Sequence, residues 1–481
     1  MGTELTERTE SRKVLSRTAW GIALVLVGAL AFRAWNISTW SMWEDEQGSM
    51  ALSQHPFTGF AGYFPNYFVL QNLITRIAGP SVGAARVLPA ALGLLSIALT
   101  YFCFRRFVSP RAALWAALFL ALNIGHLFWS QSIRYYTLAL VFQLLAMYWF
   151  LDGFEHNRVT SLLLSLGAFI LALLTHFSAL LLAPVLIGYL LLMMLTRERE
   201  AGYTPRNYIW YLSALAVILI LFAWRIVSLR NMIGGWEISS ARDPVHVGTT
   251  VVAYFGVPVL VMGLLAPWLT RTLSRRVRLF LLTASFIPVL ELLVISWMNI
   301  VNVTWYYAFI SLIGFTLLAG AVLEDLRQCG RPRLAAALGG TSVAYYLLFL
   351  GAYHLMWHGD RPRWQEAAEF LNNTTDIRPG MAAPPDIHAS VPGVVEFYLG
   401  DPSHPEGHRL VSAVSPHPEA PTNPRGCWYI VEAKLISPEY ESWFAAHCVL
   451  RARFESLTGP IDRSVLVYEF APIPKAVGHS Q

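Results

Sequence analysis

The stretch VGAARVLPAALGLLSIALTYFCF, residues 82–104, decides the fold class of this chain. It is almost free of charge and has the length that an α-helix needs to cross the hydrocarbon of a bilayer, about 20 residues. Similar runs recur from Leu15 to Tyr353 and then stop. The 481 residues are 55% hydrophobic and 14% charged, whereas soluble domains are about 25% charged. The composition therefore excludes an ordinary soluble protein.

The hydrophobic runs predict a polytopic α-helical membrane protein of about eleven transmembrane helices. The first run is long, lacks a small-residue cleavage site and is followed by further spans, so it should stay as an anchor rather than be removed as a signal peptide. The predicted spans are residues 17–35, 82–104, 112–129, 135–152, 160–175, 177–195, 208–228, 249–270, 279–297, 304–323 and 334–353.

Arginine and lysine lie mainly on one side of these spans, which predicts the orientation because such residues favour the cytoplasmic side. With the N-terminus in the cytoplasm, the short outer loops hold about four: Arg76, Arg134, Arg230 and Arg242. The cytoplasmic segments hold eighteen: Arg8, Arg12, Lys13, Arg17, Arg105, Arg106, Arg111, Arg158, Arg197, Arg199, Arg206, Arg271, Arg275, Arg276, Arg278, Arg327, Arg331 and Arg333. An odd number of spans places the C-terminus outside.

Three domains follow from this topology. Residues 1–16 are a cytoplasmic tail, and 17–353 are a transmembrane module whose first outer loop is 36–81. Residues 354–481 are a small soluble α/β domain on the extracytoplasmic side. Its predicted elements are helices at Arg363–Leu371 and Pro438–His447, the second capped by Ser437, strands at Cys427–Glu432, Val449–Phe454 and Ser464–Phe470, and an irregular loop at Pro402–Pro424.

The four cysteines are too few for a disulfide framework. Cys427 and Cys448 share the predicted outer domain, where an oxidising compartment would let them pair, so we treat a disulfide between them as a hypothesis.

Composition and motifs also bear on partners and cofactors. The net charge of +5 comes largely from arginines between spans, so it reports topology and predicts no nucleic-acid partner. We expect no cofactor and no required metal, although two of His354, His358 and Asp360 are spaced to hold one ion. A polar membrane exit is the favoured explanation of these three residues. A nucleotide-binding Gly-rich loop is missing from the sequence, which argues against an ATP-driven transporter.

Three adjacent carboxylates, Glu44, Asp45 and Glu46, open the otherwise apolar first outer loop. Burial and mutual repulsion could raise the pKa of one of them and make it a general base. A solvated acidic turn or a helix N-terminus explains the same residues without catalysis.

The order of several motifs resembles the C-type membrane glycosyltransferases, in the bacterial branch similar to protein O-mannosyltransferases and lipid A aminoarabinose transferase (glycosyltransferase family 39). The resemblance covers most of residues 15–360 and extends weakly to Arg363-Trp-Gln-Glu-Ala-Ala. The motifs that carry it are Trp-Glu-Asp-Glu (43–46), Tyr-Phe-Pro-Asn-Tyr-Phe-Val-Leu (63–70), Gly-Pro-Ser-Val-Gly-Ala-Ala-Arg-Val-Leu-Pro (79–89), Trp-Ser-Gln-Ser-Ile-Arg-Tyr-Tyr (129–136) and Leu-Leu-Thr-His-Phe (173–177).

The resemblance implies an inverting transfer of a sugar from a polyprenyl phosphate carrier to an acceptor on the outer face of a bacterial inner membrane. Asp45 matches the acidic residue that deprotonates or orients the acceptor. Glu46 would assist it, and Glu44 would face solvent. The acceptor, whether lipid, glycan or protein, is not fixed by the sequence.

The same resemblance implies a set of donor-binding residues. Arg134 is the first choice for the lipid phosphate, because a guanidinium donates two parallel hydrogen bonds; a snorkelling interfacial arginine is the alternative. Arg86 would contact phosphate or form a structural salt bridge. His176 would contact phosphate or sugar, or be a satisfied buried histidine. Tyr135 and Tyr63 complete the expected substrate-binding set, although an aromatic residue at the position of Tyr135 more often belongs to an interfacial belt. We expect Asp45 and Arg134 to meet in one pocket.

Three departures bear on these roles. Many relatives have His-Pro-Pro-Leu at the position of Tyr63-Phe64-Pro65-Asn66, an acidic residue at that of Ser132, and Arg-Tyr at that of Trp305-Tyr306. The departures at Ser132 and Trp305 leave open a noncatalytic binder of lipid-linked sugars. A carrier or flippase for a lipid-linked solute is a separate alternative. Transporters usually place ionisable groups at the midplane in paired halves, whereas Glu291 is the only clear carboxylate deep in a predicted span.

Overall fold

The computed structural model of the protein describes residues 2–195, 205–233, 243–298, 303–375, 385–399, 411–414, 426–458 and 461–470. The chain forms two compact units. The first unit comprises Met1–Ile37 and Leu52–Leu350, and the second comprises Ser38–Ala51 and Gly351–Gln481. The second unit thus combines the C-terminal part of the chain with a short segment from the first predicted outer loop.

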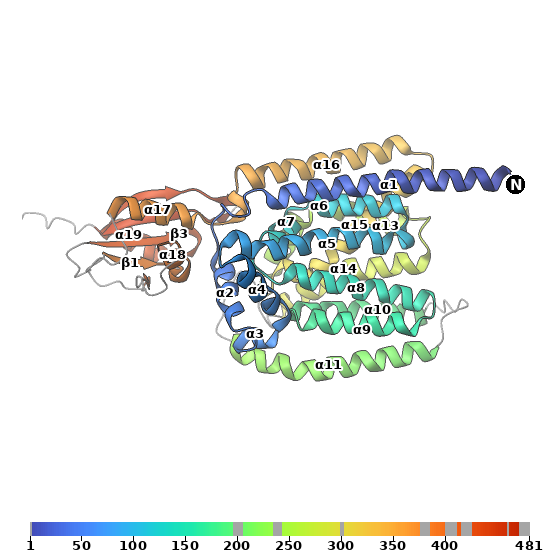
Figure 1. Ribbon diagram of the computed structural model, residues 1–481, viewed down its shortest axis with the longest axis horizontal. Coiled ribbons are helices and arrows are strands. Elements are labelled where there is room, and N and C mark those ends of the chain that lie inside the picture. Colours follow the sequence, from blue (N-terminus) through green and yellow to red (C-terminus); the bar gives the residue numbers. More distant parts are fainter. Residues whose placement is uncertain are drawn as a thin grey trace, which may run out of the picture. The chain divides into compact units, whose positions relative to one another are not determined.

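The first unit is helical, and α1, α9 and α11 run along a common direction in Figure 1. Its elements are α1 (Gly2–Ala34), α3 (Gly59–Tyr63), α4 (Pro65–Ala78), α5 (Val82–Val108), α6 (Pro110–Leu122), α7 (Ile124–Ser130), α8 (Tyr136–Glu155), α9 (Val159–Leu173), the 3₁₀ helix η1 (Phe177–Leu181), α10 (Leu182–Leu195), α11 (Pro205–Ile233), α12 (Pro244–Phe255), α13 (Val257–Leu269), α14 (Arg275–Trp297), η3 (Trp305–Ala308), α15 (Phe309–Gln328) and most of α16 (Pro332–Leu355).

The predicted fold class, a polytopic helical membrane protein with a small α/β domain, is confirmed. All eleven segments predicted as spans are helical. Within the described residues, seven helices are long and apolar enough to cross a membrane, or up to nine if each of two bent pairs counts as one span. Thr18–Ala34 and Val159–Leu173 are shorter apolar helices. The count of eleven therefore stays a prediction.

Two predicted spans are broken rather than straight. The α6–α7 pair bends by 65° at Asn123, and the α12–α13 pair bends by 99° at Gly256. Asn123 joins the two breaks, because its side chain accepts a hydrogen bond from His126 N and its Nδ2 donates to the carbonyl of Phe255 at 3.0 Å. Gly256 has φ +90°, a conformation that a residue with a Cβ rarely adopts.

Helix α15 forms the centre of the first unit. Every residue from Phe309 to Leu326 is buried, and a helix that is apolar around most of its circumference packs on all sides. Its main neighbours are α6, α13 and α14.

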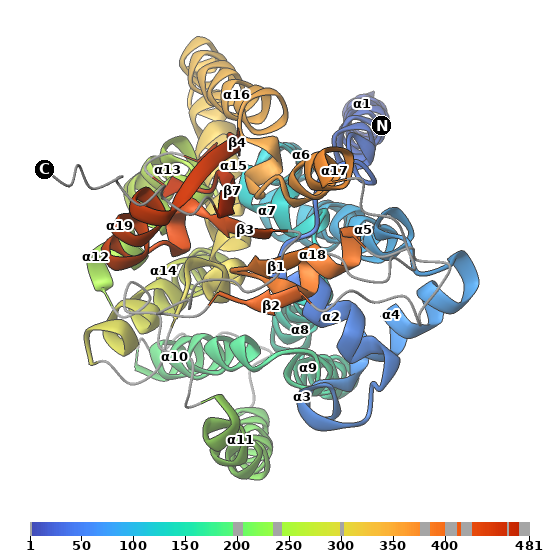
Figure 2. The same ribbon diagram turned by 90° about the vertical axis from the view of Figure 1, so that its left-hand side faces the viewer.

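The second unit contains a five-stranded mixed sheet in the order β2-β1-β3-β7-β4 (Figure 2). Strand β1 is parallel to β2 and β3, and β7 is antiparallel to β3 and β4. The elements are α2 (Glu44–Gln54), which begins in this unit, η4 (His358–Asp360), α17 (Trp364–Thr375), β1 (Asp386–Ala389), α18 (Pro392–Leu399), β2 (Val411–Ala413), β3 (Cys427–Glu432), η5 (Ala433–Leu435), α19 (Pro438–His447), β4 (Cys448–Phe454), the two-stranded β5 (Leu457–Thr458) and β6 (Ile461–Asp462), and β7 (Val465–Phe470).

Helices cover both faces of this sheet. Strand β3 is buried along its whole length, because alternate residues enter two different cores. Trp428 and Ile430 pack with α17 and α18 on one face, whereas Tyr429 and Val431 pack with Phe444 of α19 on the other. Successive side chains of a strand point to opposite faces, so a continuous apolar run is what a doubly covered strand requires.

Most elements predicted for the C-terminal domain are present. The strand at Cys427–Glu432 and the helix at Pro438–His447 have the predicted bounds, and Ser437 Oγ caps that helix by accepting from Tyr440 N at 3.3 Å. The predicted irregular loop Pro402–Pro424 lies mostly outside the described residues, but Val411–Ala413 within it is a strand, β2, at one edge of the sheet.

The hypothesis of a Cys427–Cys448 disulfide is wrong, since both cysteines are free. Cys427 lies on β3 and Cys448 on β4, and β7 lies between these strands. Neighbouring strands are about 4.8 Å apart, so residues two strands apart exceed the roughly 7 Å that a disulfide tolerates between Cα atoms.

Candidate active site

His176 lies in the first unit between α9 and η1, where it caps η1. Its Nδ1 accepts a hydrogen bond from Ser178 N at 3.2 Å and lies 2.8 Å from Ser178 Oγ. Because a backbone N–H can only donate, Nδ1 carries no proton, and the neutral ring holds its proton on Nε2. That Nε2 is buried and has no hydrogen-bond partner among the described residues. His176 thus presents one unused N–H donor.

Arg134 and Tyr135 lie against this histidine. The ring of Tyr135 stacks on His176 with centroids 4.4 Å apart and an interplanar angle of 18°. The guanidinium carbon of Arg134 is 4.5 Å from the Tyr135 ring centroid, and Nη2 donates to Tyr135 Oη at 2.7 Å. The structure therefore brings three sequence-predicted residues, Arg134, Tyr135 and His176, into one stack of a cation on two rings.

Aromatic side chains from three other parts of the first unit surround the stack. Tyr136 lies 5.0 Å from His176 and 4.8 Å from Tyr306, and Tyr307 lies 5.5 Å from His176. Trp129 packs on Tyr306 at 4.6 Å. Such a lining lowers the local dielectric and strengthens any hydrogen bond made to an anion there. The sequence did not assign Tyr306 or Tyr307 to the site, because their place near His176 depends on packing between separate helices.

The departures from the family pattern have structural explanations. Ser132 is buried and its Oγ donates to the carbonyl of Phe128 at 2.7 Å. Trp305 stacks on Tyr254 with centroids 4.2 Å apart and an interplanar angle of 6°. Both side chains therefore pack within the unit in place of the charged residues expected from relatives.

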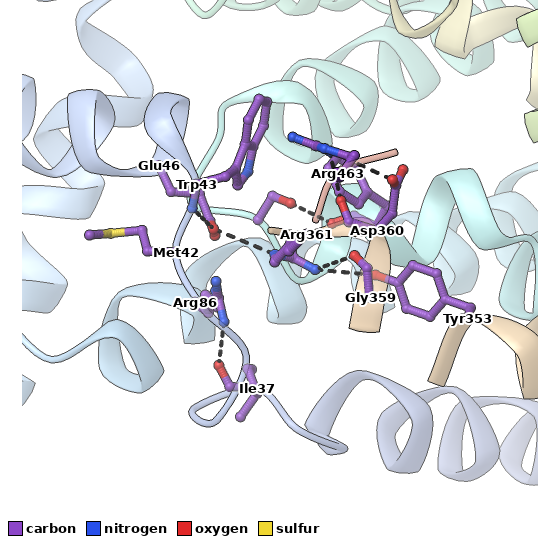
Figure 3. Close-up of polar contacts among 12 residues, drawn as sticks. Ile37, Met42, Trp43, Glu46, Arg86, Tyr353, Gly359, Asp360, Arg361 and Arg463 are labelled. Atoms are coloured by element: carbon purple, nitrogen blue, oxygen red, sulfur yellow. Dashed lines mark hydrogen bonds and ion pairs between the residues drawn. The ribbon is translucent and has the colours of Figure 1, made fainter. Parts of the chain in front are cut away.

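The contacts that the structure shows for Arg86 and Tyr63 are with residues outside the stack of Arg134, Tyr135 and His176. Arg86 is buried on α5 and its Nη1 donates to the carbonyl of Ile37 at 3.0 Å (Figure 3). The Tyr63 ring lies 5.6 Å from the guanidinium carbon of Arg225, which also donates to the Gly62 and Tyr63 carbonyls. These contacts tie segments of the first unit together, and the substrate-binding roles of Arg86 and Tyr63 stay predictions.

The three acidic residues form the first turn of α2 in the second unit. Glu44 is exposed, Asp45 is half-buried and Glu46 is buried. Carboxylates suit this position because the helix dipole is positive at its N-terminus. Partial desolvation by neighbouring protein, followed by the charge of Asp45, raises the pKa of Glu44. The structure thus gives the three carboxylates three different environments.

Glu46 has two structural contacts, both visible in Figure 3. Its Oε2 accepts a hydrogen bond from Trp43 N at 3.4 Å, half of a capping box. The same oxygen lies 3.5 Å from Nε of Arg361, and both side chains are fully buried. Burial alone would lower the pKa of Arg361, but Tyr353, Glu46 and Asp360 raise it above its usual value. Arg361 was not identified from the sequence, because nothing local connects it to Glu46.

Residues at the predicted polar exit from the membrane lie close to charged protein side chains. Asp360 Oδ1 lies 3.6 Å from Arg463, and His358 Nε2 lies 3.8 Å from Glu366. Across the described residues, no group of three His, Cys, Asp or Glu side chains could hold a metal ion. The expected meeting of Asp45 and Arg134 stays a prediction, because these residues belong to different compact units.

The architecture and these side chains define a class of protein: a multi-pass helical membrane protein with a small mixed-sheet domain and a cationic, aromatic-lined cluster in its helical unit. Residues 55–226 match the family model of the dolichyl-phosphate-mannose-protein mannosyltransferases. No curated protein matches the chain in sequence.

Two solved structures resemble the chain over almost its full length, and a third over part of it. ArnT from Cupriavidus metallidurans in the apo state has a TM-score of 0.56 at 16% identity, covering 95% of this chain and 98% of ArnT. The same protein bound to undecaprenyl phosphate gives 0.55 at 15% identity, over 94% and 98% of the two chains. An Archaeoglobus fulgidus oligosaccharyltransferase complex with Zn and sulfate gives 0.50 at 13% identity, over 78% and 61%. The chain has the fold of the C-type membrane glycosyltransferases, and the resemblance predicted from the sequence is confirmed.

Proposed function

We propose that this chain is an integral membrane glycosyltransferase that moves a sugar from a polyprenyl phosphate carrier to an acceptor on the outer face of a bacterial inner membrane. The observation that carries the proposal is the stack of Arg134, Tyr135 and His176. It offers a guanidinium and an unused N–H donor in an aromatic lining, within a fold shared with a protein whose structure contains undecaprenyl phosphate.

Donor recognition would use Arg134 and His176 together. The guanidinium of Arg134 neutralises one phosphate charge and can donate two hydrogen bonds. The Nε2–H of His176 donates to a phosphate or sugar oxygen without adding charge. Aromatic rings such as Tyr135 and Tyr306 can pack on the sugar ring and on the first apolar units of the lipid.

The transfer is a single displacement with inversion at the anomeric carbon. Asp45 removes the proton from the acceptor hydroxyl or amine, and the acceptor atom forms a bond to the anomeric carbon. The bond between that carbon and the phosphate oxygen breaks, and its electron pair remains on the lipid phosphate. Arg134 and His176 stabilise the charge that develops there. This chemistry balances without a cofactor.

Asp45 suits the role of base better than its neighbours do. Glu46 is fully buried beside the Trp43 N–H and Arg361, whereas Asp45, on the same helical turn, is partly exposed. Side chains of consecutive residues in a helix point about 100° apart, so Asp45 points in a different direction from Glu46. Glu46 would assist by holding the turn.

The test replaces Asp45 in purified protein reconstituted in lipid with an acceptor extract and a panel of labelled polyprenyl phosphate sugars. Asp45→Asn keeps the size of the side chain but removes its basicity, and we expect transfer to fall about 10²- to 10⁴-fold. Glu44→Gln, on the exposed neighbouring carboxylate, is the matched control and should retain transfer.

Other outcomes separate the alternatives. Undiminished transfer by Asp45→Asn would refute its role as base. Donor binding without turnover of any sugar would identify a noncatalytic binder. Movement of intact donor between leaflets of a proteoliposome, with no product formed, would identify a carrier.

A further inference from the structure

The start of the acidic helix α2 is built into the second unit together with residues from the C-terminal part of the chain. Ser41 Oγ accepts a hydrogen bond from Gln365 N at 3.0 Å. Met42 N donates to Tyr398 Oη at 2.6 Å. The segment that leads into α2 therefore has its backbone and side-chain hydrogen bonds satisfied by α17 and α18, elements more than 300 residues away along the chain.

Trp40 fixes the same segment from the other side. It is buried and stacks on His354 with centroids 5.2 Å apart. A Cβ added to Gly359 would lie 2.3 Å from the Trp40 ring, so only glycine fits there. Gly359 has φ +64° and is flanked by His358 at +48° and Asp360 at +59°. The left-handed conformation costs roughly 1–2 kcal/mol at each non-glycine residue, and the surrounding contacts must hold this turn in place.

The strained turn delivers Arg361 to Glu46. Arg361 Nη1 donates to the Gly359 carbonyl at 2.8 Å, and the Arg361 carbonyl accepts from Ser456 Oγ at 2.8 Å. Its Nε faces Glu46 Oε2 at 3.5 Å. Hydrogen bonds thus fix both the backbone and the guanidinium of Arg361 next to the Glu46 carboxylate.

A second arginine extends the network to the sheet. Arg463 pairs with Glu432 on β3 at 3.1 Å and donates to the Asp360 carbonyl at 2.8 Å. Its guanidinium carbon lies 6.0 Å from the Trp43 ring centroid, within cation–π range. Trp43, which precedes α2, and Glu46, in its first turn, therefore each contact an arginine from the C-terminal part of the chain.

We propose that Arg361 is a positioning residue for Asp45. Its buried ion pair with Glu46, together with the capping bond from Trp43, holds the turn in which Asp45 lies, so the C-terminal part of the chain sets the place of the base without touching substrate. This inference rests on the proposed function for its catalytic consequence, whereas the holding of residues 41–51 can be measured without any activity.

The experiment compares full-length wild type with Arg361→Gln and with the conservative Arg361→Lys, both in lipid nanodiscs. Hydrogen exchange of peptides within residues 41–51 reports on the turn. The single-turnover rate at saturating donor, normalised to the fraction of molecules that bind undecaprenyl phosphate, reports on the base. Arg451→Gln is the control, since Arg451 is a largely exposed arginine of β4 paired with Glu469.

We expect Arg361→Gln to increase exchange in 41–51 and to lower the transfer rate about tenfold, the effect of losing one buried charge–charge contact, while donor affinity stays unchanged. Arg361→Lys should recover part of both losses. A purely structural role would instead lower the folded fraction and leave the normalised rate unchanged, and that result would overturn the proposal. So would unchanged exchange in 41–51.

Two further results keep the inferences distinct. If Arg361→Gln fails to fold, Glu46→Gln takes its place, because it removes the carboxylate charge and keeps the side-chain length; wild-type exchange and rate in that variant would overturn the proposal. If wild type transfers no sugar from any donor, the proposed function fails, and the exchange of 41–51 in the Arg361 variants alone decides whether Arg361 holds the turn.

Discussion

The two groups of candidate residues are built in opposite ways. In the helical unit, the cation of Arg134 lies on an aromatic ring, and His176 keeps an N–H that no described residue uses. In the second unit, Glu46 and Arg361 are both fully buried and face each other. Buried polar groups are normally satisfied, so an unused donor suggests a ligand, whereas a closed ion pair suggests a fixed framework. The comparison distinguishes residues that bind a ligand from residues that fix the position of a neighbouring segment.

The sharpest way to break this comparison is to remove the cation of the helical unit. Arg134→Gln should weaken binding of undecaprenyl phosphate roughly ten- to hundredfold, since a hydrogen bond to a charged group contributes about 1.5–3 kcal/mol. Equilibrium binding of radiolabelled undecaprenyl phosphate to nanodiscs measures this directly. Arg76→Gln, at an exposed arginine in the last turn of α4, should bind as wild type does. Equal affinities for both variants would reduce Arg134 to a structural residue.

A smaller change tests the unused donor. His176→Phe keeps a ring that can stack on Tyr135 but removes the Nε2–H, and we expect donor affinity to fall about tenfold, the value of one hydrogen bond to an anion. The same binding measurement applies, with His55→Phe at an exposed site as control. Unchanged affinity would mean that His176 serves only packing.

The smallest effect on donor binding should come from changes near the Glu46–Arg361 ion pair in the second unit. Gly359→Ala places a methyl group against Trp40 in a left-handed turn, whereas Gly426→Ala in the same unit has φ +92° and open space. Both variants carry backbone strain of about 1 kcal/mol, so only the clash separates them. We expect faster hydrogen exchange around Trp40 in Gly359→Ala alone and wild-type donor affinity in both. Reduced affinity in Gly359→Ala would show that the framework also shapes the donor site.

Much of the fold could be predicted from the sequence because it depends on local patterns. Apolar runs identified all eleven helical segments, and Ser437 before an acidic first turn marked the start of α19. The bends at Asn123 and Gly256 were not predicted, since each run is apolar over most of its length and the hydrogen bond from Asn123 to the Phe255 carbonyl joins two separate runs. The wrong disulfide hypothesis had the same origin, because strand order is not a local property.

The candidate site shows a similar division. Arg134, Tyr135 and His176 could be named from short motifs, and the structure places them together. Arg361 could not, because its partner Glu46 lies in a distant part of the chain and the ion pair forms only after the second unit has folded. Residues that position a site are determined by tertiary packing. Residues that bind a ligand need a particular side-chain chemistry, which a short sequence motif can show.

Photolabelling can show whether the cluster of Arg134, Tyr135 and His176 binds a lipid phosphate. A polyprenyl phosphate with a diazirine on its first isoprene unit would be irradiated with the wild-type protein in nanodiscs, and the labelled peptides would be mapped by mass spectrometry. We predict labels in peptides containing residues 129–136 and 303–309, competed away by unlabelled undecaprenyl phosphate and reduced in Arg134→Gln. Competed labels found only outside these segments would contradict the account.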